Sequence, residues 1–164
     1  TYLEVYFRRD LIFTPGDLLK GETGQELAPY VIENGWPEMK NKFIFCLSGT
    51  DSWKAHYASL DPAQRLCFAD KDVPDDDPGL DPPKTGNIVF FNFHIWHYNR
   101  NIWTMTIPRF AQKNLIVRAY KANSDDNWED CLNCGVSAIA TDKVSDHTWA
   151  KVNETDPYAK RGGR

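Results

Sequence analysis

The chain has 164 residues, a net charge of −4 and a 13% share of aromatic residues. That length predicts a single domain over residues 1–164 with a sizeable core, and the negative charge argues against a nucleic-acid-binding surface. No apolar run approaches the roughly 20 residues that a membrane helix needs, so no membrane span is expected.

Helices and strands alternate in the predicted N-terminal half. Tyr2–Arg8 is apolar and aromatic enough for a first strand. Thr14-Pro15-Gly16-Asp17 is typical of a helix start, because Thr caps a helix, Pro suits its first turn and Asp favours its positive end. The sequence further predicts a helix over Gln25–Glu33, a strand over Lys42–Leu47 and a helix over Ser52–Ser59.

A loop and then a sheet core follow. Asp70–Lys84 holds six Asp and four Pro without apolar periodicity, which predicts a solvated loop. Three apolar runs then come in close succession, and the polar break Asn99–Arg100 has the length of a hairpin loop. The predicted fold class is therefore α+β, with a mostly antiparallel sheet core and short helices in the N-terminal half. The runs are Asn87–Tyr98, Ile102–Ile107 and Leu115–Tyr120, followed by a polar loop over Asn123–Asp130, an edge strand over Gly135–Ala140 and a flexible polar tail from about residue 145.

Four cysteines and one glycosylation sequon, Asn-Glu-Thr at Asn153, predict a secreted, disulfide-bonded glycoprotein. The natural pairing is Cys46–Cys67 and Cys131–Cys134, and a cross-pairing stays open because the second ring would be very small. Cys131-x-x-Cys134 would also serve as half of a zinc site, but the sequence lacks a second CxxC or a paired His motif.

Two histidines in the predicted core, His94 and His97, raise the question of a metal site. On a strand, residues three apart point to opposite faces, so these two are not expected to share an ion. His94 is expected to share a face with Asn92 and Trp96. No metal is predicted.

Arg8, Ser48 and Thr50 are the candidate binding residues, because each comes at the end of a predicted strand. Arg8 could orient a phosphate or pyrophosphate through a bidentate contact; the structural alternative is an ion pair with Asp10 or Glu4. Ser48 and Thr50 could contact the same ligand, and the structural alternative for both is capping of the helix that follows.

The order of these motifs resembles the mono-ADP-ribosyltransferase toxins of the heat-labile enterotoxin and pertussis type. Val5–Asp10 and Thr14–Leu18 look like the opening of that family, and Phe45–Thr50 is similar to its Phe-x-Ser-Thr-Ser strand. Ile107-Pro108 and the later Arg118 and Tyr120 look like its Ile-Pro segment and the strand that follows. The resemblance implies NAD as the cofactor, contacted by Arg8, Ser48 and Thr50. The family's catalytic glutamate has no counterpart, since the matching turn is Asn99-Arg100-Asn101.

The sequence thus predicts a secreted, monomeric toxin- or effector-like virulence protein on an ADP-ribosyltransferase-like fold without efficient transferase activity. Whether it is an enzyme stays open. The alternative is a non-enzymatic secreted binding module for a carbohydrate or a host protein, based on the excess of aromatic residues. Its candidate platforms are Trp36, Trp53, Trp96, Trp103, Trp128 and Trp149.

Overall fold

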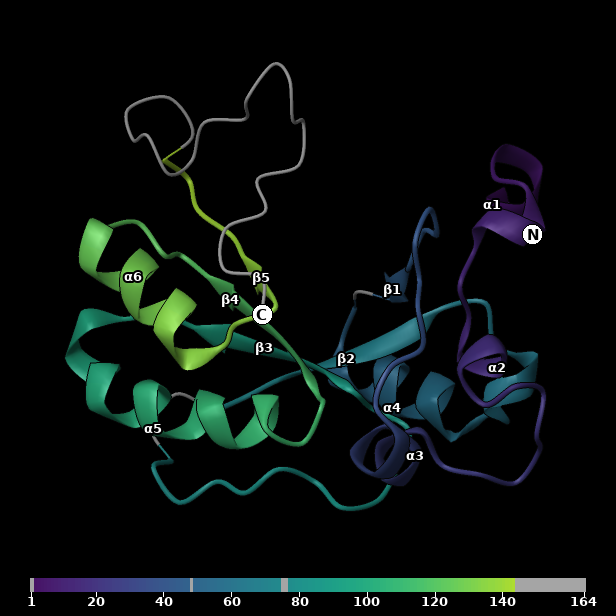
Figure 1. Cartoon of the computed structure of the whole chain (residues 1–164), viewed down its shortest axis with the longest axis horizontal. Coiled ribbons are helices and arrows are strands. Elements are labelled where there is room, and N and C mark those ends of the chain that lie inside the picture. The colour runs from purple at the N-terminus through teal and green to yellow at the C-terminus, as the bar shows by residue number, and fades with distance from the viewer. Residues whose placement is uncertain (1, 48, 75–76, 144–164) are drawn as a thin grey trace. The chain divides into compact units, whose positions relative to one another are not determined.

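The computed structural model describes residues 2–47, 49–74 and 77–143 (Figure 1). The described helices are α1 (Tyr2–Tyr6), α2 (Pro15–Leu18), α3 (Leu27–Asn34), α4 (Asp51–Ser59), α5 (Arg100–Ala111) and α6 (Asp125–Cys134), with single 3-10 turns at Arg9–Leu11 (η1), Pro62–Gln64 (η2) and His97–Asn99 (η3). The described strands are β1 (Cys46–Leu47), β2 (Phe68–Asp72), β3 (Phe90–His94), β4 (Ile116–Tyr120) and β5 (Ala138–Ile139).

The sheet is parallel, so the prediction of a mostly antiparallel core is wrong. Its strands follow one another in the order β1-β2-β3-β4-β5. Cys46 lies opposite Phe68 in the parallel pairing of β1 with β2, and Arg118 lies opposite Ala138 in the parallel pairing of β4 with β5. Strand order and sequence order coincide, so the chain advances across the sheet without reversing.

The predicted return strand Ile102–Ile107 is a helix, and this explains the error. It forms the middle of α5, whose fully buried side chains Trp103, Ile107 and Phe110 recur at helical spacing. A helix between β3 and β4 carries the chain back to the start of the next strand. A parallel pair needs such a crossover of a dozen or more residues, which the predicted two-residue hairpin could not provide.

Further predicted elements differ from the structure, and the predicted loop Asp70–Lys84 begins inside β2. Tyr2–Tyr6 is helix α1 rather than the first part of a strand. The predicted polar loop Asn123–Asp130 contains the start of α6, where the Ser124 side chain caps the helix by accepting a bond from the Asn127 amide. The helices at Pro15, Gln25 and Ser52 are confirmed as α2, α3 and α4, although long helices also occur in the C-terminal half.

The chain divides into two compact units, and the division passes through β3. The first contains the chain up to Asp72 together with Pro82–Phe91 and Gln112–Leu115. Its core holds the leucines of α2 and α3 and a group of rings in which Phe68 lies 5.1 Å from Phe90 and 5.8 Å from Trp36.

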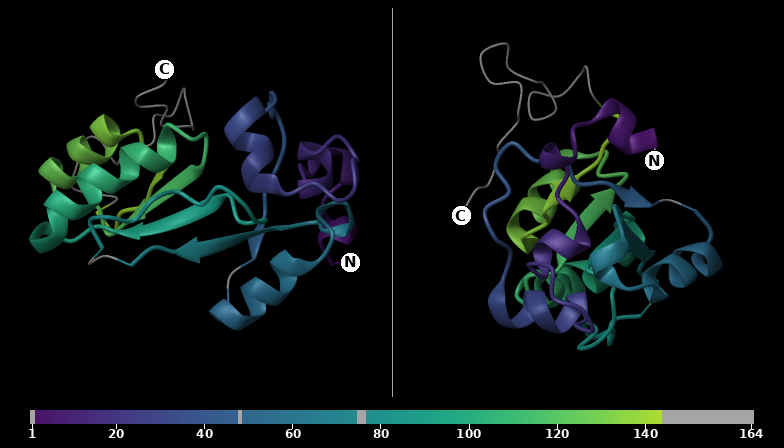
Figure 2. Two further views of the ribbon diagram at one scale, coloured as in Figure 1. Left: turned by 90° about the horizontal axis from the view of Figure 1, so that it is seen from below. Right: turned by 90° about the vertical axis from the view of Figure 1, so that its right-hand side faces the viewer.

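The second unit contains Val73–Asp81, Asn92–Ala111 and the chain from Ile116 on. In it, α5 and α6 lie on one face of the strands (Figure 2, left). This is expected, because right-handed crossovers that always advance in one direction place their helices on the same side. Phe93 of β3 meets Phe110 of α5 edge-on at 5.4 Å. Residues that alternate with the buried Val117 and Ala119, notably Arg118 and Tyr120, therefore belong to the opposite face.

Helix α5 contains a proline whose effect is offset by a neighbouring thiol. Pro108 has no amide hydrogen, so the Thr104 carbonyl one turn earlier lacks its usual helical donor. The Sγ atom of Cys134, at the end of α6, donates to that carbonyl oxygen at 3.7 Å. The contact joins the two helices at the point where the proline interrupts the hydrogen bonds of α5.

The disulfide prediction is also wrong: the four cysteines, all in the described part of the chain, form no disulfide. Cys46 is the register partner of Phe68, and Cys67 precedes Phe68. Successive side chains alternate between faces, so Cys46 and Cys67 point apart. Cys131 is fully buried, and burial raises its pKa to about 12. Cys134 instead faces the Thr104 carbonyl, as described above.

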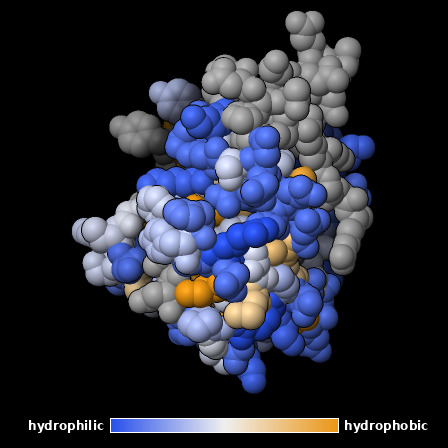
Figure 3. All heavy atoms as spheres, turned by 90° about the vertical axis from the view of Figure 1, so that its left-hand side faces the viewer, coloured by the Kyte–Doolittle hydropathy of each residue, from blue (hydrophilic) through white to orange (hydrophobic). Residues whose placement is uncertain are grey.

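The side of the molecule formed by α5 and α6 is mainly hydrophilic, with apolar residues in small separate groups (Figure 3). Within the described ranges, no helix combines the length and the apolar character that crossing a membrane requires.

Candidate functional site

The carboxyl ends of β3 and β4 form the candidate site. In a parallel sheet these ends meet at one edge, and ligands of parallel-sheet proteins bind at that edge. β3 ends at His94 and β4 ends at Tyr120. The two ends are adjacent, since the Ile95 amide donates to the Tyr120 carbonyl oxygen at 3.0 Å.

Four aromatic side chains form a continuous series there, which we call the aromatic ladder: Tyr120, His94, Trp96 and Tyr98. The rings of Tyr120 and His94 stack at 4.8 Å with only 7° between their planes. His94 lies 4.0 Å from Trp96, whose indole N–H donates to His94 Nδ1. Trp96 then stacks on Tyr98 at 5.7 Å and 22°. Because Nδ1 accepts this bond, the neutral His94 ring carries its proton on Nε2.

Buried polar groups hold the middle of the ladder in place. The side chain of Asn99, which is only 4% exposed, accepts a bond from the Trp96 amide at 3.2 Å. The buried Trp103 of α5 donates its indole N–H to the Trp96 carbonyl oxygen at 3.1 Å. Residues of η3 and α5 therefore hold the backbone of Trp96, and the bond from its indole N–H to His94 orients its side chain.

Two cations complete the site. The Nζ atom of Lys121 lies 4.6 Å from the centre of the Trp96 ring, and the Cζ atom of Arg118 lies 5.7 Å from the centre of the Tyr120 ring. Both distances are within the range of cation–π attraction. Lys121 has a backbone φ of 63°, an uncommon conformation for a residue other than glycine. Such conformations concentrate at functional sites.

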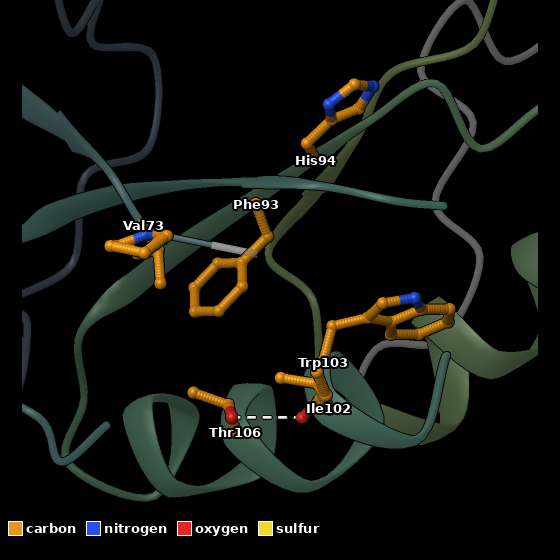
Figure 4. Close-up of a pocket in the computed structure, with 7 residues that line it drawn as sticks. Val73, Phe93, His94, Ile102, Trp103 and Thr106 are labelled. Carbon is orange, nitrogen blue, oxygen red and sulfur yellow. Dashed lines mark hydrogen bonds between the residues drawn. The ribbon is translucent and has the colours of Figure 1, made fainter. Parts of the chain in front are cut away.

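A cavity on the other side of β3 is too small to be the binding site. It lies between β3 and α5 and is surrounded by apolar groups of Val73, Phe93, Ile102 and Trp103 (Figure 4). Its volume of about 10 Å³ would admit about one water molecule. Figure 4 also shows that Phe93 points toward α5 while His94 points to the opposite side of the strand.

The predicted ligand residues of the first unit form contacts with neighbouring side chains or lie outside the described residues. Arg8 forms a two-bonded ion pair with Asp10, at 2.8 and 3.0 Å, and this hydrogen bonding lowers the pKa of Asp10. Thr50 precedes α4 without a capping bond from its side chain, and its hydroxyl lies 3.1 Å from that of Ser52. No described hydrogen bond or ion pair joins Arg8 to Thr50. Ser48 lies outside the described residues.

The remaining predicted residues are distributed as follows. His94 and Trp96 do share a face, as predicted, and they are in contact. The described residues hold no group of three or more His, Cys, Asp or Glu side chains able to bind a metal ion. Among the other tryptophans, Trp53 is 70% exposed on α4, whereas Trp103 is buried and Trp36 packs among core rings. Trp149, Asn153 and the predicted tail lie outside the described residues.

Sequence reasoning missed Lys121, and it noted Arg118 and Tyr120 only through the toxin resemblance. The proximity of Lys121 to Trp96 follows from the parallel pairing of β3 and β4, which the antiparallel prediction did not provide. No protein-family model, no curated protein and no solved structure matches the chain. The resemblance to the ADP-ribosyltransferase toxins therefore stays a prediction.

Proposed function

We propose that the chain is a carbohydrate-binding module that uses the aromatic ladder as its platform. The observation that carries the proposal is the ring of Tyr98, which is 70% exposed and is supported by Trp96, on which it stacks with 22° between the ring planes. Aromatic rings offer a large apolar face together with polar edges. A sugar ring presents the matching surface, because its C–H groups form an apolar face and its hydroxyls form a polar rim.

The preformed geometry supports binding of a rigid ligand. Asn99 and Trp103 hold the backbone of Trp96 from both sides, as described above. A platform that is already ordered loses little conformational entropy when a ligand binds. The ordered geometry therefore favours a role of this surface in ligand binding over a contact between Tyr98 and Trp96 that has no function.

The composition of the two strands favours binding over cleavage. The sequence from Asn87 to Asn123 contains no Asp and no Glu. Most glycosidases use a pair of such carboxylates, one on each side of the scissile bond. The strands that carry the ladder supply neither member of the pair.

Secretion remains part of the proposal. With the disulfides absent, the Asn153 sequon is the feature that supports it. A carbohydrate-binding role accords with an extracellular location, where polysaccharide ligands are abundant.

Binding to immobilised oligosaccharides, followed by calorimetry on each saccharide retained, tests the proposal. Tyr98→Ala and Trp96→Ala should weaken binding at least tenfold. Two matched controls should bind as the wild type does: Tyr6→Ala removes a tyrosine that is 77% exposed, and Trp53→Ala removes a tryptophan that is 70% exposed. Circular dichroism checks that each variant is folded.

Two results would contradict the proposal. One is a wild-type protein that retains no saccharide. The other is binding that Trp53→Ala abolishes and Tyr98→Ala leaves unchanged, which would move the platform to α4.

A further inference from the structure

We infer that the ligand of the aromatic ladder is an acidic saccharide, whose negative group is bound by Arg118 and Lys121. This inference rests on the proposed function and specifies its ligand. It starts from the charges of the segment that carries the ladder, which are unlike those of the chain as a whole. The segment from Asn87 to Asn123 contains five Lys and Arg residues and no acid, within a chain of net charge −4.

Arg118 and Lys121 differ from the other cations that order the fold. Ion pairs with carboxylates within 4 Å occupy Arg8, Arg9, Lys54, Arg100 and Arg109. In the described residues, neither Arg118 nor Lys121 has such a partner, and both side chains lie against rings of the ladder instead. Their charges are therefore available to a ligand.

The nearest acids along the chain have another role. Asp125 and Asp126 stand in the first turn of α6, where carboxylates complement the partial positive charge of a helix N-terminus.

The rings hold both cations where a ligand on the ladder would meet them. Lys121 lies over the Trp96 ring, and Arg118 lies over Tyr120 on the same face of β4. An arginine fork matches a carboxylate or sulfate group with two parallel hydrogen bonds, and a lysine adds a point charge. A saccharide that bears such groups would stack on the exposed ring of Tyr98, because the other rings of the ladder cover one another, and its acidic groups would meet Lys121 and Arg118 along the ladder. A neutral saccharide would make only the ring contact and leave both cations uncompensated.

Calorimetry with three hexasaccharides tests the inference on the full chain: a heparin-derived one that carries sulfates, a galacturonate hexamer that carries carboxylates, and neutral cellohexaose. We expect at least one acidic hexasaccharide to bind at least tenfold more tightly than cellohexaose at 50 mM NaCl. The difference should shrink at 300 mM NaCl, because salt screens exposed charges.

Variants locate the charges. Arg118→Gln and Lys121→Gln should each weaken acidic-saccharide binding roughly tenfold and thereby reduce the preference for the acidic hexasaccharide over cellohexaose. Lys113→Gln, which removes an exposed lysine of the same segment outside the site, should change neither. Inorganic sulfate, tested alone, should bind at least a hundredfold more weakly than the acidic hexasaccharide.

Three results would contradict the inference or the proposed function, and they can be told apart. Equal binding of acidic and neutral hexasaccharides, unaffected by Arg118→Gln, would overturn the acidic ligand and leave the carbohydrate platform standing. Sulfate binding as tight as hexasaccharide binding would show that the rings contribute nothing and would overturn the inference. Failure of all three hexasaccharides to bind, with no other saccharide retained by the immobilised panel, would overturn both proposals.

Discussion

Cys134 donates its Sγ–H to the Thr104 carbonyl oxygen that Pro108 leaves without a helical donor. A thiol is a weak donor, so this contact replaces only part of the lost backbone bond.

We expect Pro108→Ala to raise the free energy of unfolding by about 1–2 kcal/mol, because alanine restores the amide and relieves the ring clash. Urea unfolding measures the change. Pro37→Ala, in an exposed loop, is the control and should instead lower stability slightly. A less stable Pro108→Ala protein would show that the fold needs the interruption in α5.

Arg65 is buried without a hydrogen-bonding partner for any of its three guanidinium nitrogens in the described residues. It is 2% exposed, and its Cζ atom lies 5.8 Å from the centre of the Tyr57 ring. Burial lowers its pKa, against the opposing effects of Tyr57 and Asp61, yet an arginine stays protonated in proteins. Replacing buried charged groups by apolar side chains of similar volume often stabilises a protein, so Arg65→Met should gain about 1–3 kcal/mol. A loss of stability in urea unfolding would reveal an acceptor for the guanidinium.

Lys54 joins α4 to the end of β2 through ion pairs of its almost completely buried side chain. Its Nζ atom lies 2.9 Å from Asp70, 3.4 Å from Asp51 and 3.7 Å from Asp72, and the residue is only 4% exposed. Burial acts to lower its pKa, but the bond to Asp70 and the neighbouring carboxylates outweigh it and raise the pKa.

Lys54→Met should therefore destabilise the protein by about 2–4 kcal/mol, since it leaves Asp70 without its cation. Lys71→Met, at an exposed position on the same strand, should change stability by less than about 0.5 kcal/mol. Chemical denaturation of both variants provides the comparison. Equal effects would mean that the ion pair contributes nothing specific.

The Cys131 thiol predicts a loss of stability at alkaline pH. Its pKa of about 12 in the folded protein exceeds the value near 8.5 of an unfolded chain. Between those values the unfolded state releases a proton that the folded state retains, so stability is complete below pH 8.5 and falls above it by about 1.4 kcal/mol per pH unit. Unfolding free energies measured from pH 8 to 10.5 should show a shallower decline in Cys131→Ala than in the wild type. Parallel curves for the two proteins would contradict the assignment.

The sequence contained enough information to locate most helices of the first half, because their ends carry strong local signals. Thr14 and Asp17 form the reciprocal capping bonds that their spacing predicts. Helix α6 carries comparable signals, with Ser124 at its start and Gly135 in a left-handed conformation just past its end. It was missed because Cys131 is its one fully buried side chain, so the segment lacks an apolar stripe.

Helix α5 shows why the sheet topology could not be predicted. Its sequence is rich in Ile, Thr and Trp, which favour strands when considered locally. Packing against β4 overrides that preference, since Trp103, Ile107 and Phe110 bury one side of a helix. This segment connects β3 to β4, so predicting it as a strand instead of a helix also gave the wrong relative direction for β3 and the strands after it. The same error hid the proximity of Lys121 to Trp96, and with it the candidate site.

At position 121, the residue that would best stabilise the fold differs from the residue that would best bind a ligand, because the backbone there is left-handed. Glycine adopts a φ of 63° without the cost of about 1 kcal/mol that a side chain incurs there. Lys121→Gly would relieve this strain and would also remove the cation over the Trp96 ring. A selection for thermostability alone would favour glycine at position 121, whereas a selection for ligand capture would retain lysine. Competitive selection at this single codon would therefore report which of the two properties the chain depends on.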